Sequence, residues 1–275
     1  MYASKGPVVE EWADRVFFGP AGWRIATALM PTRVSPDAVT FASLVLGVVA
    51  GHLLWYTNAW INLAGVGLFI WSDILDSADG QLARLRGTST RLGRILDGLA
   101  DSARFLSLYL HLAARLYMTG WGWSGIALGL GGLFSHAYQA AAVDFIRHAY
   151  LYFAVGKGSE LEVGSEDYSG IAGWLYRDYL RRQSWLFPRT TELARTFAGR
   201  TIPEGLSRTW AERQRWVVAG CAWIAQNIRW LLLAVTVVPG WPAAYCWIVV
   251  GPLNAVLIFL IIAHEREPRL CIAAY

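Results

Sequence analysis

Five aspartates lie close together between apolar stretches of the chain. They fall within DILDSADGQLARLRGTSTRLGRILDGLAD, residues 73–101, and are Asp73, Asp76, Asp79, Asp97 and Asp101. Carboxylates close to lipid are energetically expensive, so they usually mark a functional site. Because residues three or four apart share a helix face, Asp76 and Asp79 form one acidic pair. Asp97 and Asp101 form a second.

The connection between the two acidic pairs is short. Residues 81–92 link them, so two antiparallel neighbouring helices are expected to bring the pairs face to face. Four converging carboxylates would repel one another unless cations lay among them. Ligands that are all oxygen favour a hard divalent cation such as Mg²⁺ or Mn²⁺. The spacing therefore predicts a divalent-cation site.

The residues around the acids suit phosphate chemistry. Gly80 lets a ligand approach the backbone, and Arg84 offers a planar fork of donors for phosphate oxygens. Ala83 and Gly93 are small residues on the two facing helices. An alternative interpretation is that these acids and arginines form ordinary ion pairs at a membrane interface.

Apolar blocks around the acids are long enough to hold them in a membrane. The chain has 275 residues, of which 55% are apolar and 16% charged, unlike an average soluble domain. Crossing about 30 Å of hydrocarbon takes roughly 20 helical residues. Six blocks reach that length, at about 38–57, 60–80, 97–118, 122–146, 215–238 and 242–263. The predicted fold class is an all-α membrane protein with six transmembrane helices.

The distribution of charge predicts the orientation of these helices. The connections TNAW, TGWGW and PGWPAA carry no charge, whereas Lys and Arg concentrate in the N-terminal region, the link after Asp79 and residues 147–215. Since short cytoplasmic loops are rich in Lys and Arg, both termini are predicted to be cytoplasmic. Asp76 then lies roughly 22 Å along its helix from the far side, just below the cytosolic surface. The bacterial inner (plasma) membrane is the expected location.

Two segments outside the blocks are predicted to lie at the membrane surface. Residues 1–34 mix aromatic and charged side chains, which is typical of an interfacial helix that precedes a membrane domain at 35–275. Ser35, Pro36 and Asp37 mark a helix start. A cytosolic insertion at about 150–214 contains a second amphipathic pattern. The net charge of +4 favours anionic lipid head groups over nucleic acid as partners.

Residues 76–101 resemble the CDP-alcohol phosphotransferase (CDP-alcohol phosphatidyltransferase) family. They match its signature D-x2-D-G-x2-A-R-x8-G-x3-D-x3-D letter for letter. The matching residues are Asp76, Asp79, Gly80, Ala83, Arg84, Gly93, Asp97 and Asp101. Six spans, with the signature across the second and third, are also similar to the family. Residues 150–214 are longer than the family leads us to expect.

The resemblance implies a role for each residue of the signature. Asp76, Asp79 and Asp97 would hold two divalent cations, Mg²⁺ or Mn²⁺. Asp101 would lie near the second cation and act as general base. The CDP moiety would be bound by Gly80, Ala83, Arg84, Thr90 and Gly93, with Asp37 and Thr40 closing over the cytidine. The resemblance also implies a homodimer.

The resemblance leaves the substrates open. The favoured reaction transfers a phosphatidyl group from CDP-diacylglycerol to a small polar alcohol and releases CMP in phospholipid biosynthesis. The alternative uses CDP-choline or CDP-ethanolamine as donor and diacylglycerol or a similar lipid alcohol as acceptor. A prenyltransferase is disfavoured because its aspartate motifs lack the G-x2-A-R element. A cation channel is disfavoured because the acids gather at one level of the membrane.

Polar residues within the later blocks are candidates for an acceptor pocket. On the fourth block, His136, Gln139, Asp144 and Arg147 fall on one helical stripe. Further residues could face the same cavity, namely Arg104, Arg115, Asn227 and Arg229. The alternative is that these groups pair with one another for helix packing, for example Asp144 with an arginine.

Overall fold

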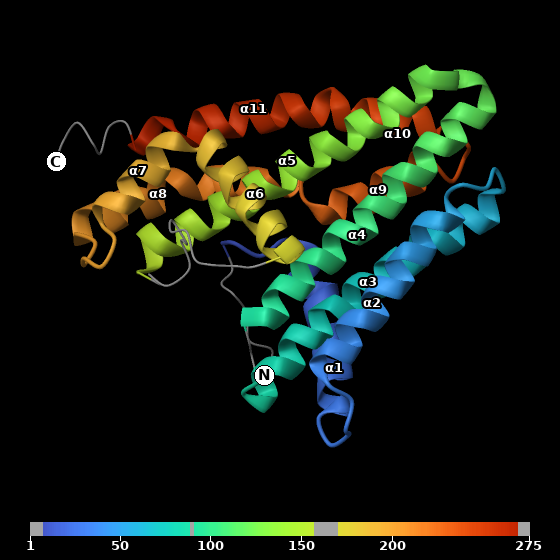
Figure 1. Ribbon diagram of the computed structural model, residues 1–275. Helices are drawn as coiled ribbons and strands as arrows, with labels where there is room; N and C mark the ends of the chain where they lie inside the picture. The colour runs from blue at the N-terminus through green and yellow to red at the C-terminus, as the bar shows by residue number, and fades with distance from the viewer. Residues whose placement is uncertain (1–7, 89–90, 157–169, 269–275) are drawn as a thin grey trace. The chain divides into compact units, whose positions relative to one another are not determined.

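The computed structural model describes residues 8–88, 91–156 and 170–268, without the side chains of 91–97, 170–172, 175 and 176. All regular secondary structure in these residues is helical (Figure 1). The chain divides into two compact units. The first unit contains residues up to Ser135 together with Asn227–Val250, and the second contains His136–Gln226 and the residues from Gly251 onward.

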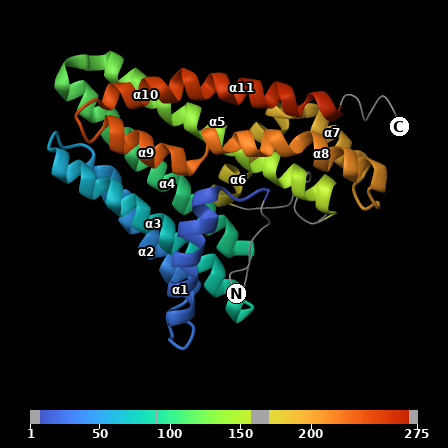
Figure 2. The same cartoon turned by 180° about the vertical axis from the view of Figure 1, so that it is seen from behind.

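The first unit opens with a short amphipathic helical stretch. A π-helix, η1 (Asp14–Phe18), continues into α1 (Gly19–Leu29). The next helix, α2 (Pro36–Leu53), begins where the sequence predicts, because the Ser35 hydroxyl accepts a hydrogen bond from the Ala38 amide at 3.2 Å. Both helices pack against α3 (Ala59–Arg86), as both views show (Figures 1 and 2).

Small residues let these helices approach closely. A Cβ added at Gly22 of α1 would lie 2.7 Å from the Ser77 hydroxyl of α3. One added at Gly51 of α2 would lie 2.8 Å from the backbone nitrogen of Leu108 on α4. Glycine at such crossings is typical of packed membrane helices. These crossings fix α1 against α3 and α2 against α4.

The helices α4 (Arg91–Leu116) and α5 (Gly122–Val155) form an antiparallel pair. The backbone turns between them through η2 (Tyr117–Trp121), where Gly120 has φ 99°. Cβ atoms added at Gly125, Gly129 and Gly132 would lie within 3 Å of Leu116, Ala113 and Tyr109 respectively. The residue numbers of the glycines rise along α5 while those of their partners fall along α4, so the two helices are antiparallel. The predicted third and fourth helices therefore appear as two separate helices.

Two helices from late in the chain complete the first unit. They are α9 (Gln226–Thr236) and α10 (Pro242–Val250). Trp230 of α9 stacks on Phe69 of α3 with ring centroids 4.5 Å apart. The Tyr109 and Tyr245 hydroxyls, 3.3 Å apart, join α4 to α10. The core of this unit is thus built around α3 and α4.

The second unit contains the rest of α5 and the remaining helices. These are α6 (Gly170–Leu186), α7 (Pro188–Thr196), α8 (Glu204–Gly220), η3 (Cys221–Trp223) and α11 (Pro252–His264). The Glu265 carboxylate accepts hydrogen bonds from the Arg189 and Thr190 amides at 2.9 and 3.1 Å. This contact satisfies two amides at the start of α7.

Five helical stretches are long and apolar enough to cross a membrane. They are Pro36–Leu53, Ala59–Arg86, Gly98–Val155, Glu204–Thr236 and Pro242–Pro268. The third stretch contains the turn at η2. Many large apolar side chains along these helices are exposed, such as Phe41, Trp71 and Phe259. Together with the all-helical secondary structure, these features indicate an integral membrane protein.

Candidate active site

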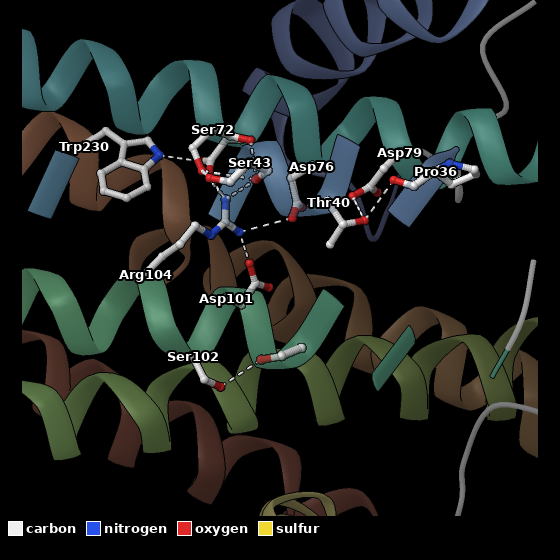
Figure 3. A network of polar contacts seen from close by, with 12 residues as sticks. Pro36, Thr40, Ser43, Ser72, Asp76, Asp79, Asp101, Ser102, Arg104 and Trp230 are labelled. Atoms are coloured by element: carbon white, nitrogen blue, oxygen red, sulfur yellow. Dashed lines mark hydrogen bonds and ion pairs between the residues drawn. The ribbon is translucent and has the colours of Figure 1, made fainter. Parts of the chain in front are cut away.

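Four aspartates form a carboxylate cluster in the first unit: Asp73, Asp76 and Asp79 of α3, and Asp101 of α4. Figure 3 labels Asp76, Asp79 and Asp101. The three acids of α3 are spaced by three residues, so they follow one helical face. Asp79 is 6% exposed, whereas the Asp101 side chain is 42% exposed. The side chain of Asp97, the remaining signature acid, lies outside the described residues.

Arg104 of α4 joins the cluster. Its guanidinium forms ion pairs with Asp73 at 3.3 Å and Asp76 at 3.2 Å, and a closer one with Asp101. Arginine presents its donors in a planar fork, so a single guanidinium can bind several carboxylates at fixed angles. Because Asp76 and Asp101 belong to different helices, this side chain ties α3 to α4.

Two buried serines and a tryptophan surround the inner end of the cluster. The Arg104 guanidinium donates to the hydroxyls of Ser43 and Ser72 at 3.2 and 2.7 Å. The Trp230 indole donates to Asp73 at 2.5 Å. Since both serines have no exposed surface, water does not compete for these hydrogen bonds.

Thr40 of α2 contacts the cluster directly. Its hydroxyl lies 2.5 Å from an oxygen of Asp79 and donates to it, and lies 3.2 Å from the Pro36 carbonyl. Thr40 and Asp37 are predicted to close over the cytidine of a CDP group. The structure adds that Thr40 orients a predicted cation ligand.

Gly80 and Arg84 lie one turn apart beside Asp79. A Cβ added at Gly80 would lie 3.5 Å from a guanidinium nitrogen of Arg84, in ordinary van der Waals contact with it. Thr90 and the surroundings of Gly93 lie outside the described residues. The predicted roles of these residues, and of Ala83, in binding CDP stay predictions.

Residues 33–146 match the family model for CDP-alcohol phosphatidyltransferase. Within this region the chain is similar to that family. The region covers α2, α3 and α4 and most of α5, and hence every acid of the carboxylate cluster. Trp230 lies beyond it.

Three curated relatives have related names. A phosphatidylinositol phosphate synthase of Mycobacteroides abscessus is 29% identical over 111 residues, 38% of this chain and 45% of the relative. A CDP-diacylglycerol–inositol 3-phosphatidyltransferase of Drosophila melanogaster is 33% identical over 78 residues, 28% of this chain and 33% of the relative. A CDP-diacylglycerol–serine O-phosphatidyltransferase of Helicobacter pylori is 30% identical over 104 residues, 38% of this chain and 42% of the relative. The chain thus spans less than half the length of these relatives.

The residues predicted to bind the acceptor divide between the two units. Arg104 belongs to the cluster of the phosphatidyltransferase region, whereas Arg229 hydrogen-bonds Tyr245. Asn227 donates to Glu11 and Asp14, at 2.7 and 3.1 Å. Arg115 donates to the Leu54 carbonyl at 3.0 Å. Of these, Arg104 contacts the carboxylate cluster.

The predicted stripe His136, Gln139, Asp144 and Arg147 belongs to the second unit. Gln139 donates to Asn254 of α11 at 2.7 Å. Asp144 accepts a hydrogen bond from Tyr179 of α6 and lies 3.1 Å from His148. Contacts to neighbouring helices support the packing interpretation for these two residues. Their role in binding an acceptor stays a prediction.

Sequence reasoning did not find Ser43, Ser72 or Trp230. Ser72 precedes Asp76 by four residues and Arg104 follows Asp101 by three, so helical spacing places each of them on the same face of its own helix as an acid. Ser43 and Trp230 come from other helices. No local pattern signals their contact with the cluster.

Proposed function

We propose that the chain transfers a phosphatidyl group from CDP-diacylglycerol to a small polar alcohol and releases CMP. The observation that carries this proposal is the carboxylate cluster, which brings together three signature acids from two helices of the phosphatidyltransferase region. The names of two relatives, which act on inositol and serine, contain CDP-diacylglycerol. The expected product is a phospholipid.

The donor set suits divalent cations. Three carboxylates of the cluster, Asp73, Asp76 and Asp101, form ion pairs with the single guanidinium of Arg104, and Asp79 accepts a hydrogen bond from the neutral Thr40 hydroxyl, so these four acids and Arg104 together carry an excess of negative charge. All its ligand atoms are oxygens, which Mg²⁺ and Mn²⁺ prefer. Asp76, Asp79, Asp97 and Asp101 would hold two such cations. When bound, these would neutralise the pyrophosphate and stabilise both the attacking and the leaving oxygen.

Asp101 is the proposed general base. Its half-exposed carboxylate can reach a substrate hydroxyl, unlike the buried Asp79. Asp101 takes the proton of the acceptor alcohol, whose oxygen then bonds to the phosphorus distal to cytidine. The bond from that phosphorus to the bridging oxygen breaks, and CMP leaves with the electron pair.

Other residues of the signature bind and orient the donor. Arg84 would hold phosphate oxygens with its fork of donors, and Gly80 leaves the backbone open to them. Thr40 fixes Asp79 through its hydroxyl and, with Asp37, would close over the cytidine. Arg229 of the first unit is a proposed acceptor-binding residue, as are the polar residues of the α5 stripe in the second unit.

The proposed topology has six spans and cytoplasmic termini. The turn at η2 divides the stretch Gly98–Val155 into two antiparallel helices, which supports six crossings. Uncharged connections after α2, at η2 and after α9 support the orientation. The N-terminal segment, including η1 and α1, would lie in the cytosolic interface. A homodimer in the bacterial inner membrane completes the proposal, on the basis of the family resemblance.

The test is a substrate panel. Purified protein is incubated with CDP-diacylglycerol or CDP-choline, each with glycerol phosphate, inositol phosphate, serine or diacylglycerol, in the presence of Mg²⁺ or Mn²⁺. We expect CMP and one phospholipid from CDP-diacylglycerol, identified by mass, and no product after addition of EDTA. A phospholipid formed only from CDP-choline would assign the alternative donor class.

A further inference from the structure

Arg104 reaches the carboxylate cluster through a space that α2 leaves open. A Cβ added at Gly47 would lie 2.3 Å from Cδ and 2.4 Å from Cγ of Arg104. The Arg104 side chain is buried, at 3% exposure. Burying an arginine destabilises the fold unless nearby acids compensate its charge. The acids beside Arg104 provide that compensation.

The two ends of the guanidinium have different partners. Nη1 donates to Ser43, Ser72 and Asp73, none of which belongs to the signature. Nη2 contacts Asp76 and Asp101, which are both proposed cation ligands. Because the guanidinium is planar and rigid, the anchored Nη1 end determines where Nη2 lies.

Asp73, one of the three partners of Nη1, is also held by a residue of α9. Asp73 accepts the hydrogen bond of the Trp230 indole, and Trp230 stacks on Phe69. Asp73 therefore stays beside Nη1 even when a ligand competes for the outer carboxylates. Nη2 is therefore the nitrogen whose partners, Asp76 and Asp101, a bound cation can take over.

We propose that Arg104 is a built-in counter-ion that competes with divalent cations for Asp76 and Asp101. This inference rests on the proposed cation site. A cation that binds these carboxylates must displace Nη2 and then sit close to a fixed positive charge, which opposes its binding. Arg104 thereby sets the cation concentration at which the site fills, and it holds α3 and α4 together at lower concentrations.

The test measures cation binding without substrate. Mn²⁺ is titrated into purified protein in detergent, and bound Mn²⁺ is followed by the loss of the free-ion electron paramagnetic resonance signal. In Arg104→Gln, the midpoint of the titration is expected to fall by roughly tenfold or more, because a unit charge a few ångströms away is removed. Arg115→Gln is the matched control, since Arg115 is a buried arginine of the same helix that contacts the Leu54 carbonyl instead.

The outcomes separate this inference from the proposed function. If the wild-type protein binds no Mn²⁺, both the cation site and the counter-ion role are wrong. If it binds Mn²⁺ and Arg104→Gln has an unchanged or higher midpoint, the counter-ion role alone is wrong. Should Arg104→Gln fail to fold, Arg104→Lys keeps the charge but loses the fork, so its midpoint is expected to fall by a smaller factor. A midpoint above that of the wild type would contradict the inference.

Discussion

At the scale of single residues, Asp101 combines exposure with a place in the carboxylate cluster. Asp101→Asn removes the proposed proton acceptor, and a general base contributes about 10²–10⁴-fold to a rate. We expect CMP release to fall by at least about 100-fold, while binding of CDP-diacylglycerol, followed by retention of labelled donor, stays measurable. Asp178→Asn on α6 is the control, because Asp178 pairs with Arg182 outside the cluster. Rates close to those of the wild type would remove Asp101 from this role.

Thr40 offers a second prediction at this scale. Thr40→Val keeps the shape of the side chain but removes the hydroxyl that donates to Asp79. A hydrogen bond to a charged group contributes about 1.5–3 kcal/mol, so we expect kcat/KM to fall by roughly 10- to 100-fold. Thr40→Ser should retain most activity. Thr27→Val is the control, since the Thr27 hydroxyl donates to the Trp23 carbonyl of its own helix, and a loss as large in this variant would indicate a general packing effect.

At the scale of helices, glycine contacts determine how closely α2 and α4 pack. A Cβ at Gly51 would collide with the Ser107 hydroxyl at 2.6 Å and with the Leu108 backbone nitrogen at 2.8 Å, and the backbone cannot rotate away. Gly51→Ala is expected to destabilise the fold by about 1–3 kcal/mol. Gly67→Ala meets nothing within 4 Å and should be neutral or slightly stabilising. Thermal unfolding in detergent compares the two, and equal stabilities would contradict the packing argument.

Helical elements were largely predictable from hydropathy, because continuous apolar blocks report span length directly. The predicted block at 60–80 lies within α3, and Ser35 marks the start of α2. The interruption between α8 and α9 was not predicted, because a change of backbone direction leaves the average hydropathy unchanged. Likewise, the signature identified the acids but not the ion pairs that Arg104 forms with Asp73 and Asp76. Those pairs depend on which face of α4 meets α3, and the sequence of one helix does not determine how it crosses another.

At the scale of the whole molecule, the proposed topology can be tested by labelling. Thr57 and Thr88 are exposed residues just before α3 and just after it. In a background without the three native cysteines, Thr57→Cys should react with a membrane-impermeant thiol reagent in intact cells. Thr88→Cys should react only after the membrane is made permeable. The opposite pattern would invert the orientation and place the carboxylate cluster on the far side of the membrane.

The hydrogen bond between Trp230 and Asp73 crosses the boundary of the family match, since Trp230 lies beyond residue 146. A chimaera that transplants only residues 33–146 into another scaffold would leave this carboxylate without its indole donor. Such a graft would keep every letter of the signature and still lose one support of Arg104, whose guanidinium pairs with Asp73. One hydrogen bond of the carboxylate cluster is therefore donated by α9, a helix that a graft of the matched region would leave out.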